Sequence, residues 1–259
     1  MNTNELKLKI HNENYKKSIL FFDEISSTSA YCKENYKILN DKSIIIAKKQ
    51  TLGRGKNNRK WLSPPGGLYF SILLKDNLPS INLCQLIPLI VSVAVFEALK
   101  SFNVYCKIKW PNDLLINNKK ICGILVESKI SSFGLSYIVI GIGLNVNSLS
   151  PADENLNEIF ASLKEVYKTT FSLEDLLASI VNNLDNLFPK LNSNLDSVLN
   201  IYKSNCLFLN EEVTLVNNNE KIQVKILDIA KDGSLKILHN NKIRFINSGE
   251  FSIDKKHLK

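Results

Sequence analysis

The chain has 259 residues, 44% of them hydrophobic, and carries 33 Lys and Arg against 25 Asp and Glu, for a formal net charge of +8 at pH 7. This composition excludes intrinsic disorder, collagen and coiled coil, and the length suffices for one large domain with a small appendage. The positive charge suggests a nucleic-acid partner, but most of it is Lys scattered along the chain, which we interpret as a solvated surface. Arg occurs only at Arg54, Arg59 and Arg244, so two of the three fall within one short segment.

The five cysteines are odd in number and form no Cys-x-x-Cys pair. This argues against a disulfide framework or a structural zinc site and favours a reducing compartment. Residues 1–5 show no apolar segment after a basic one, so no secretory signal is expected. The most apolar stretch, residues 83–99, contains a charge and is barely long enough to cross a bilayer, so we predict a buried core helix. We expect a soluble, cytoplasmic protein.

Short apolar runs alternate with helical patterns over the first two thirds of the chain. Residues 18–22 are predicted as a strand, after which the hydroxyls at Ser26, Ser27 and Thr28 offer N-caps to a helix that runs through Tyr36. Residues 51–65 combine Gly, Pro, Asn and basic residues and are predicted as a loop. A long helix is expected at 83–102, and further strands are expected at 44–46, 68–74, 104–109, 113–116, 120–127 and 135–140. Asn117 and Asn118 predict a hairpin turn between two of these strands, because Asn tolerates positive φ.

The sequence pattern changes beyond residue 143. Helical spacing follows at 173–187 and 195–202. Beyond residue 212 the pattern becomes short alternating strands with polar turns, which is typical of a small β-barrel. We therefore predict two domains, residues 1–204 and residues 205–259. The expected strands of the second domain are 213–216, 221–227, 234–238 and 242–246.

The first segment suited to chemistry spans residues 50–61, Gln-Thr-Leu-Gly-Arg-Gly-Lys-Asn-Asn-Arg-Lys-Trp. Its glycines let backbone N–H groups approach a ligand, and its cations could neutralise a multiply charged anion. It is neither a Walker A loop nor a dinucleotide fingerprint, because Asn58 stands where the latter needs its last glycine. A solvated mobile loop is the alternative. The use of Arg54 and Arg59 in a Lys-rich chain favours planar recognition of phosphate or carboxylate.

The second segment, residues 109–113, reads Lys-Trp-Pro-Asn-Asp. Pro111 favours an extended Trp110 and cannot sit in mid-sheet, so the Asn-Asp pair is expected at a strand edge. Both tryptophans of the chain, Trp61 and Trp110, lie in these two segments. Aromatic walls with a few polar groups are typical of a small-ligand pocket, although Trp110 fits plain core packing equally well.

Two further features follow. Lys120 begins an apolar strand, where a cation turns outward unless a bound anion holds it. Residues 141–147, Gly-Ile-Gly-Leu-Asn-Val-Asn, are expected at a strand end, where glycines permit close approach of a ligand and amides suit hydroxyl, phosphate or metal-bound water. Such Gly-x-Gly turns are common and indicate little alone.

Taken together in this order, the segments resemble the biotin protein ligases from about residue 21 to residue 252. The resemblance rests on the motifs Gly-Arg-Gly…Arg-Lys-Trp, Lys-Trp-Pro-Asn-Asp, Lys-x-x-Gly-Ile-Leu-Val-Glu and Gly-x-Gly-x-Asn. It implies an α+β fold: a mixed β-sheet flanked by helices, like the catalytic domain of class II aminoacyl-tRNA synthetases, with a small C-terminal SH3-like β-barrel.

The resemblance also implies a reaction in two steps. The biotin carboxylate attacks the α-phosphate of ATP, which is bound with Mg²⁺, to give biotinyl-5′-adenylate and pyrophosphate. A lysine of a biotin carboxyl carrier protein then attacks the mixed anhydride. Cations are needed because two anions must meet before the first step. The implied partners are biotin, ATP and the carrier protein, without DNA or membrane, and a homodimer stays open.

Roles for individual residues follow from their positions within the motifs. The implied catalytic residues are Arg54 and Lys120, at the carboxylate and α-phosphate. The implied biotin-binding residues are Ser27, Thr28, Ser29, Gln50, Gly53, Arg54, Gly55, Lys56, Trp61, Lys120 and Gly123. The implied nucleotide-binding residues are Arg54, Arg59, Trp61, Lys109, Asn112, Asp113 and Asn145, with Mg²⁺ near the last two. Trp61 is expected to help close the loop over the adenylate and exclude water from it.

The chain departs from the family pattern at several positions. Ser29 stands where the family usually has Asn, and Lys56 and Asn58 replace an Arg and a Gly. Lys56 keeps the charge but loses the planar fork, so weaker retention of the adenylate is expected. Glu250 matches a family acidic position, whereas Asp254 stands where an Arg can lie near the nucleotide. The C-terminal barrel is therefore left out of the expected site.

Three alternatives are weighed. A lipoate–protein ligase shares the adenylation logic but needs apolar walls for a dithiolane instead of hydroxyl and amide groups. A thiol-using acyltransferase needs a nucleophilic Cys, and Cys122 on a buried strand is expected to be inert. A nucleic-acid-binding module would show strongly salt-dependent affinity. Only about 20 residues precede the first strand, too few for a helix-turn-helix domain, so a monofunctional ligase is expected.

Overall fold

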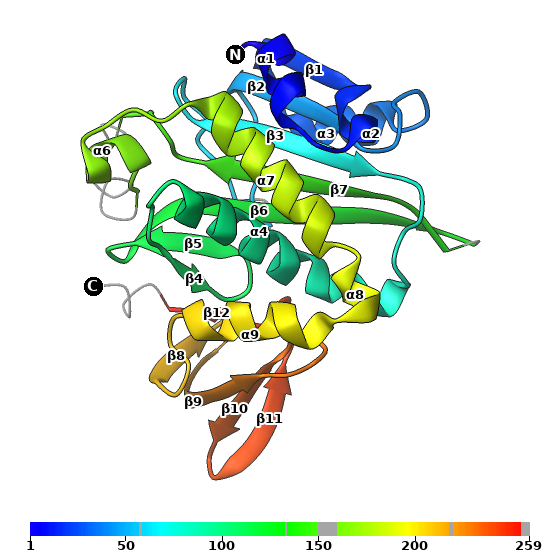
Figure 1. Cartoon of the computed structure of the whole chain (residues 1–259). Helices are drawn as coiled ribbons and strands as arrows, with labels where there is room; N and C mark the ends of the chain where they lie inside the picture. Colours follow the sequence, from blue (N-terminus) through cyan, green and yellow to red (C-terminus); the bar gives the residue numbers. More distant parts are fainter. Residues whose placement is uncertain (57–58, 133, 150–159, 218–219, 255–259) are drawn as a thin grey trace.

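The computed structural model describes residues 1–56, 59–132, 134–149, 160–217 and 220–254. Its larger part is built on a seven-stranded sheet with the strand order β1-β2-β3-β7-β6-β5-β4 (Figure 1). The first pair, β1 and β2, is parallel, and the other neighbouring pairs are antiparallel. The strands are β1 (Ile19–Ile25), β2 (Ser43–Gln50), β3 (Leu68–Leu74), β4 (Lys107–Lys109), β5 (Asp113–Ile116), β6 (Lys119–Ser131) and β7 (Gly134–Leu144).

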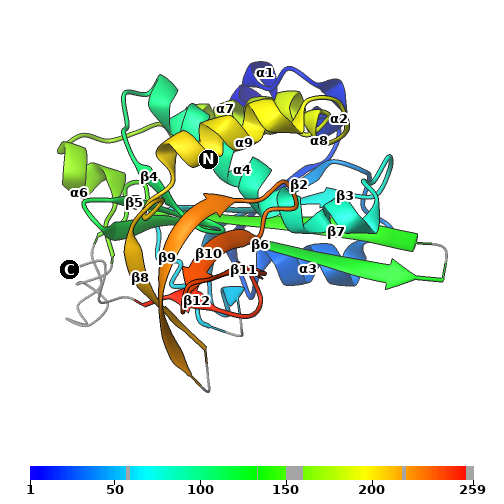
Figure 2. The ribbon, with the colours of Figure 1, turned by 90° about the horizontal axis from the view of Figure 1, so that it is seen from below.

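Helices cover both faces of this sheet (Figures 1 and 2). On one side lie α4 (Ile87–Ser101), α7 (Leu173–Leu187) and α9 (Leu195–Asn205), with α4 packed against the other two. On the opposite side α3 (Thr28–Asn35) contacts β2, β3 and β7. Within the described residues, the structure also has the helices α1 (Thr3–Lys9), α2 (Glu13–Lys16), α6 (Leu163–Tyr167) and α8 (Lys190–Ser193) and the 3-10 helix η2 (Ile81–Leu86).

The apolar helix predicted for residues 83–102 is the core helix α4, preceded by η2. Together, Ile81–Ser101 pass the length and hydropathy criteria for a membrane span. Its side chains are nonetheless largely buried inside this fold, Val91, Val93 and Val95 completely so. Packing against the sheet, α7 and α9 accounts for its composition, because a helix that is apolar all round needs neighbours on every side.

Local signals placed several elements correctly. The Ser27 side chain accepts a hydrogen bond from the Ala30 N–H at 3.4 Å and caps α3. The hairpin turn between β5 and β6 consists of Asn117 and Asn118, whose φ angles are +49° and +62°. The cap and the turn were both predicted at these positions, because a hydroxyl satisfies a free helical N–H and Asn tolerates positive φ.

The C-terminal part is a second sheet, with the order β11-β10-β9-β8-β12. All its pairings are antiparallel. A mixed sheet flanked by helices and followed by a small β domain confirms the predicted fold class, while the boundary at 204/205 stays a prediction. The strands are β8 (Glu212–Val216), β9 (Lys221–Ile229), β10 (Leu235–His239), β11 (Lys242–Ile246) and β12 (Ser252–Ile253).

Two expectations need correction. The predicted strand 104–109 is only Lys107–Lys109, since the chain turns after α4 through Asn103, whose φ is +59°. The strand predicted for 135–140 is longer, Gly134–Leu144, because β3 and β6 pair with it on both sides as far as Leu144, so the segment 141–147 spans the end of β7, with Gly141 and Gly143 in its last residues.

Candidate active site

A cavity of about 890 Å³ lies between the large sheet and the C-terminal sheet. This volume suits a small-molecule or nucleotide-sized ligand. The sequence-predicted site residues, Gly53 excepted, all line it, although they come from α3, the loop after β2, and strands β4 to β7. Gly53 lies behind the lining, where a Cβ atom would meet the Trp61 carbonyl oxygen at 2.6 Å and the Ser63 hydroxyl at 2.9 Å. The tight packing of the loop therefore requires a glycine at this position.

One end of the cavity is polar and uncharged. At the N-terminus of α3, the Thr28 N–H donates to Gln50 Oε1 at 2.9 Å, and the Thr28 hydroxyl donates to the same oxygen at 3.2 Å. The Gln50 amide in turn donates to the Ser63 hydroxyl at 2.9 Å. Ser27, Thr28, Ser29 and Gln50 thus meet at one place, as predicted from their separate motifs, and present hydroxyl and amide groups to the cavity.

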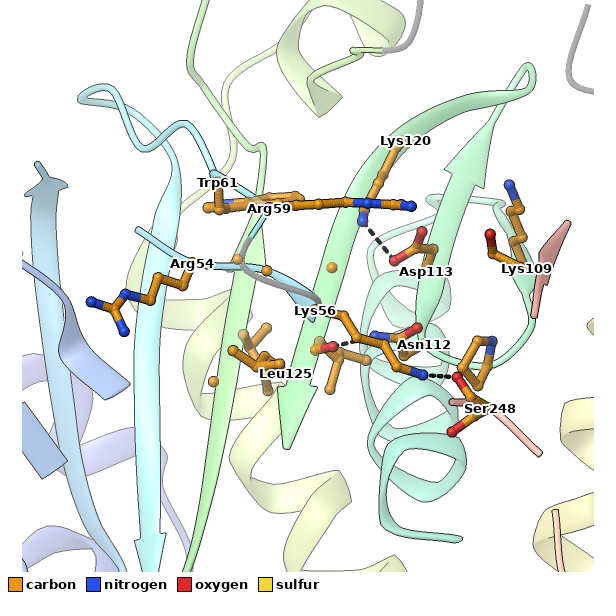
Figure 3. A pocket seen from close by; sticks show the side chains of 18 of the residues that line it. Arg54, Lys56, Arg59, Trp61, Lys109, Asn112, Asp113, Lys120, Leu125 and Ser248 are labelled. Carbon is orange, nitrogen blue, oxygen red and sulfur yellow. Dashed lines mark hydrogen bonds and ion pairs between the residues drawn. The ribbon is translucent and has the colours of Figure 1, made fainter. Parts of the chain in front are cut away.

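The opposite end is charged. Lys120 Nζ lies 2.6 Å from Asp113 Oδ1 and 5.0 Å from the centre of the Trp61 ring (Figure 3). Lys120 is thus held by the Asp113 carboxylate of the chain itself, and the expectation that a bound anion holds it stays a prediction. Both side chains are about one third exposed or less. An incoming anion can therefore reach this ion pair.

Trp61 lies between the two ends on a floor made by β6 and β7. Gly123 and Gly143 are cross-strand partners beneath the indole. A Cβ atom at Gly143 would stand 2.4 Å from Trp61 Nε1, and one at Gly123 would stand 2.9 Å from the ring. The Nε1 group is buried and finds no hydrogen-bond partner among the described residues. The two glycines therefore give the indole a flat seat on the sheet.

The segment at residues 50–61, here called the basic loop, contacts the C-terminal domain through one of its cations. Lys56 Nζ donates to the Ser248 carbonyl oxygen, and burial lowers the pKa of this ammonium group. Arg54 is exposed, and its side chain extends away from the Lys120–Asp113 pair (Figure 3). Arg59 is exposed as well, and Asn58 lies outside the described residues. The catalytic role predicted for Arg54 stays a prediction.

The residues expected on the nucleotide side are held by the backbone. Lys109 Nζ donates to the Ile253 carbonyl at 3.3 Å, and the Asn112 amide donates to the Ile124 carbonyl. The Asn145 amide donates to the Ala161 carbonyl at 3.1 Å. Its Oδ1 atom is buried, and the structure gives it no partner within the part of the chain that it describes. Over that same part, no cluster of three or more His, Cys, Asp or Glu could bind a metal ion.

The two remaining residues singled out from sequence are structural. Trp110 is 3% exposed, and its Nε1 donates to the Gly233 carbonyl at 3.0 Å, which joins the second motif to the C-terminal domain. Core packing, the alternative left open for Trp110, is therefore its observed state. Cys122 is fully buried, and burial raises the pKa of its thiol, so the expectation that this thiol is inert is supported.

One wall of the cavity consists of residues outside the predicted site. Residues 248–254 line it together with Val216 and Asn217 of the C-terminal domain. Glu250 and Asp254 were noticed as positions of interest and then excluded from the site. Asp254 Oδ2 lies 3.3 Å from Lys221 Nζ. The basic loop contacts this wall at the backbone carbonyl of Ser248, an atom that every residue type carries, so no local signal could have found it.

Two protein-family models match the chain. The model of the biotin/lipoate A/B protein ligase family matches residues 21–145, and that of the biotin protein ligase C-terminal domain matches residues 208–254. The solved biotin protein ligase from Aquifex aeolicus, in complex with biotin and ATP, shares 31% identity over 92% of this chain and 99% of its own, with a TM-score of 0.80. The chain therefore belongs to the biotin protein ligase family.

Curated relatives agree. The bifunctional ligase/repressor BirA of Bacillus spizizenii is 33% identical over 172 residues, 64% of this chain and 52% of that protein. The human biotin–protein ligase is 31% identical over 206 residues, 75% of this chain and 28% of that protein. The match to the Bacillus relative thus spans about half of that protein's length.

Proposed function

We propose that the chain is an ATP-dependent ligase that activates biotin as biotinyl-5′-adenylate and transfers it to a lysine of a biotin carboxyl carrier protein. One observation carries the proposal: a single cavity has a hydroxyl–amide end and a lysine end on either side of an indole. Biotin has matching parts, a ureido ring and a carboxylate.

In the first step a biotin carboxylate oxygen attacks the α-phosphorus of ATP, and pyrophosphate leaves. Carboxylate and triphosphate repel each other, so the site must offset their charge as they meet. Lys120 is the cation best placed for this, because it already holds a carboxylate, that of Asp113, at 2.6 Å in the cavity. We expect the arriving anions to compete with Asp113 for the ammonium group.

In the second step the carrier lysine, as a neutral amine, attacks the acyl carbon of the mixed anhydride, and AMP leaves. The anhydride hydrolyses if water reaches it first, so the adenylate needs a cover. The basic loop and residues 248–254 supply one, since Lys56 already joins them across the cavity.

Magnesium enters as part of the nucleotide substrate. Asp113 and Asn145 are among the residues that line the cavity, and carboxylate and amide oxygens are ligands of the kind that Mg²⁺ takes. The buried Asn145 Oδ1 is the better candidate, because it has no partner in the described structure. We place the activity in the cytoplasm, which the five free thiols support.

The polar end of the cavity favours biotin over lipoate. A dithiolane ring offers no N–H or carbonyl groups, so binding it would leave the remaining lone pairs of Thr28 and Ser29 and the second N–H of the Gln50 amide without a partner, at a cost. We expect release of pyrophosphate from ATP on addition of biotin and little on addition of lipoate, measured by a coupled pyrophosphate assay. Release with lipoate alone would assign the sister activity, and release with neither would refute adenylation.

A further inference from the structure

Ser71 lies directly behind the polar end of the cavity and belongs to none of the motifs. It is completely buried in the middle of β3. Its hydroxyl lies 2.8 Å from the Thr28 hydroxyl and 2.9 Å from the Ser29 hydroxyl. A buried hydroxyl in contact with two residues that face the ligand has the means to control how they bind it.

Ser29, Ser71, Thr28 and Gln50 form a hydrogen-bonded row, here called the hydroxyl row. The direction of each hydrogen bond in it follows from one fixed donor. The backbone N–H of Thr28 can only donate, so the Gln50 atom that it contacts is the carbonyl oxygen. That oxygen cannot donate, so the Thr28 hydroxyl donates its single proton to Gln50. Ser71 must then donate to Thr28, and Ser29 must donate to Ser71.

The row therefore has a definite polarity towards the cavity. Thr28 and Ser29 have used their protons inside the protein and offer a ligand only oxygen lone pairs. Gln50 Nε2 spends one hydrogen on Ser63 and keeps the other. Two acceptors beside one donor match a ring that carries N–H groups next to a carbonyl.

Space for this arrangement comes from the neighbouring strand. Gly141 is the cross-strand partner of Ser71 on β7. A Cβ atom at Gly141 would stand 2.6 Å from the Ser29 hydroxyl, so a larger residue would push Ser29 away from Ser71. Ser29 can complete the row because its partner strand carries a glycine at this position.

We propose that Ser71 is a positioning residue that sets ligand specificity: it orients the Ser29 and Thr28 hydroxyls as acceptors, so that the cavity selects rings with N–H groups. The inference rests on the proposed function, since it takes biotin as the ligand. Without the Ser71 oxygen, the Ser29 hydroxyl is free to rotate and to donate.

The test compares biotin with two cyclic carbamate analogues, in which one or the other ureido N–H is replaced by oxygen. Dissociation constants are measured by titration calorimetry for the wild type and for Ser71→Ala. In the wild type we expect the analogue whose oxygen faces Ser29 to bind about tenfold more weakly than biotin, the effect of about one lost hydrogen bond to a desolvated partner. In Ser71→Ala we expect this ratio to shrink to about twofold or less, because Ser29 can then donate to the oxygen.

Ser43→Ala is the matched control, because Ser43 is also completely buried, on β2, and its hydroxyl donates to the Asn40 carbonyl away from the cavity. Its ratio should equal that of the wild type. Ser71→Cys keeps a side chain of similar shape with a weak donor and should give an intermediate ratio, which tests the inference if Ser71→Ala unfolds. An unchanged ratio in both Ser71 variants, with biotin still bound, would overturn the inference alone. A wild type that binds no biotin would instead overturn the proposed function.

Discussion

Lys120 is the residue on which the proposed chemistry depends most. It lies between a carboxylate and an aromatic face, 2.6 Å from Asp113 Oδ1 and 5.0 Å from the Trp61 ring centre. Both contacts attract the ammonium group, so it stays in the cavity before any substrate arrives. The pair holds the charge in position, and substrate anions can replace Asp113.

Replacing Lys120 by Ala should lower the rate of biotin-dependent pyrophosphate release about 100-fold or more, since one preorganised charge at the transition state is lost. Lys129→Ala is the matched control. Lys129 is on the same strand, β6, and its Nζ lies 5.2 Å from the Tyr36 ring, away from the cavity lining. Near-normal release in Lys120→Ala, with Lys129→Ala also normal, would remove Lys120 from the mechanism.

Gly143 matters because of what rests on it. A methyl group there would stand 2.4 Å from Trp61 Nε1, so Gly143→Ala should displace the indole. We expect tryptophan emission to change and adenylate formation to fall about 100-fold, the cost of a misplacement of about 1 Å. The emission change should vanish in a Trp61→Phe background, where buried Trp110 is the remaining tryptophan. Its persistence there would show that the substitution acts elsewhere.

The thiols offer a check on the acyltransferase alternative. Burial raises the pKa of Cys32, Cys106 and Cys206 to about 12, and it raises that of Cys122 as well. Cys84 is the least buried of the five. An aromatic disulfide reagent at pH 8 should therefore label Cys84 first, and the buried Cys32, Cys106 and Cys122 only on unfolding. Rapid labelling of Cys122 in the native protein would reopen the thiol mechanism.

At the scale of elements, the Trp-Pro-Asn segment joins the large sheet to the C-terminal domain. Trp110 donates to the Gly233 carbonyl, and the Tyr202 hydroxyl of α9 donates to the Pro111 carbonyl at 3.0 Å. The segment is thus hydrogen-bonded to the C-terminal domain and to α9, each time through a backbone carbonyl oxygen. Its contribution to the stability of the fold can therefore be measured apart from ligand binding in the cavity.

Trp110→Phe should lower the free energy of unfolding by about 1–3 kcal/mol more than Trp61→Phe does, measured by urea denaturation. The first substitution leaves the buried Gly233 carbonyl without its donor, which costs its desolvation. The second removes an N–H that has no partner in the described structure, so it loses only packing. Equal losses would mean that the Trp110 hydrogen bond contributes no net stability.

How far the elements could be predicted depends on where their signal lies. The strand at residues 68–74 was predicted at its observed bounds, because its residues are apolar except for Ser71 and are buried on both faces. The helices α1 and α2 were missed, because they are short and packing holds them: Leu6 is fully buried and α1 contacts α7. Such tertiary support leaves no periodic pattern to find.

The same distinction between local and long-range signals applies to the site. Its residues could be predicted because each motif is local in sequence, but the contacts between motifs could not. The contact between Lys120 and Asp113 depends on a shift in register between β5 and β6, after Leu114. The wall at 248–254 depends on where the C-terminal domain sits. Long-range geometry of this kind is set by packing of the whole chain.

At the scale of the molecule, the cavity belongs to both sheets. The first sheet, with α3 and the loop after β2, contributes the hydroxyl row, the indole and the ion pair, and the second contributes the wall that Lys56 reaches. A ligand that fills the space between them would be enclosed by both. The proposed reaction needs this enclosure, because the adenylate must outlast the arrival of the carrier protein.

The most direct measurement is the mass of a carboxyl carrier domain after incubation with the protein, biotin and Mg-ATP. We expect a gain of one biotinyl group on one lysine, absent without ATP and strongly reduced with Lys120→Ala. An unmodified carrier, or a lipoyl gain when lipoate is offered beside biotin, would contradict it.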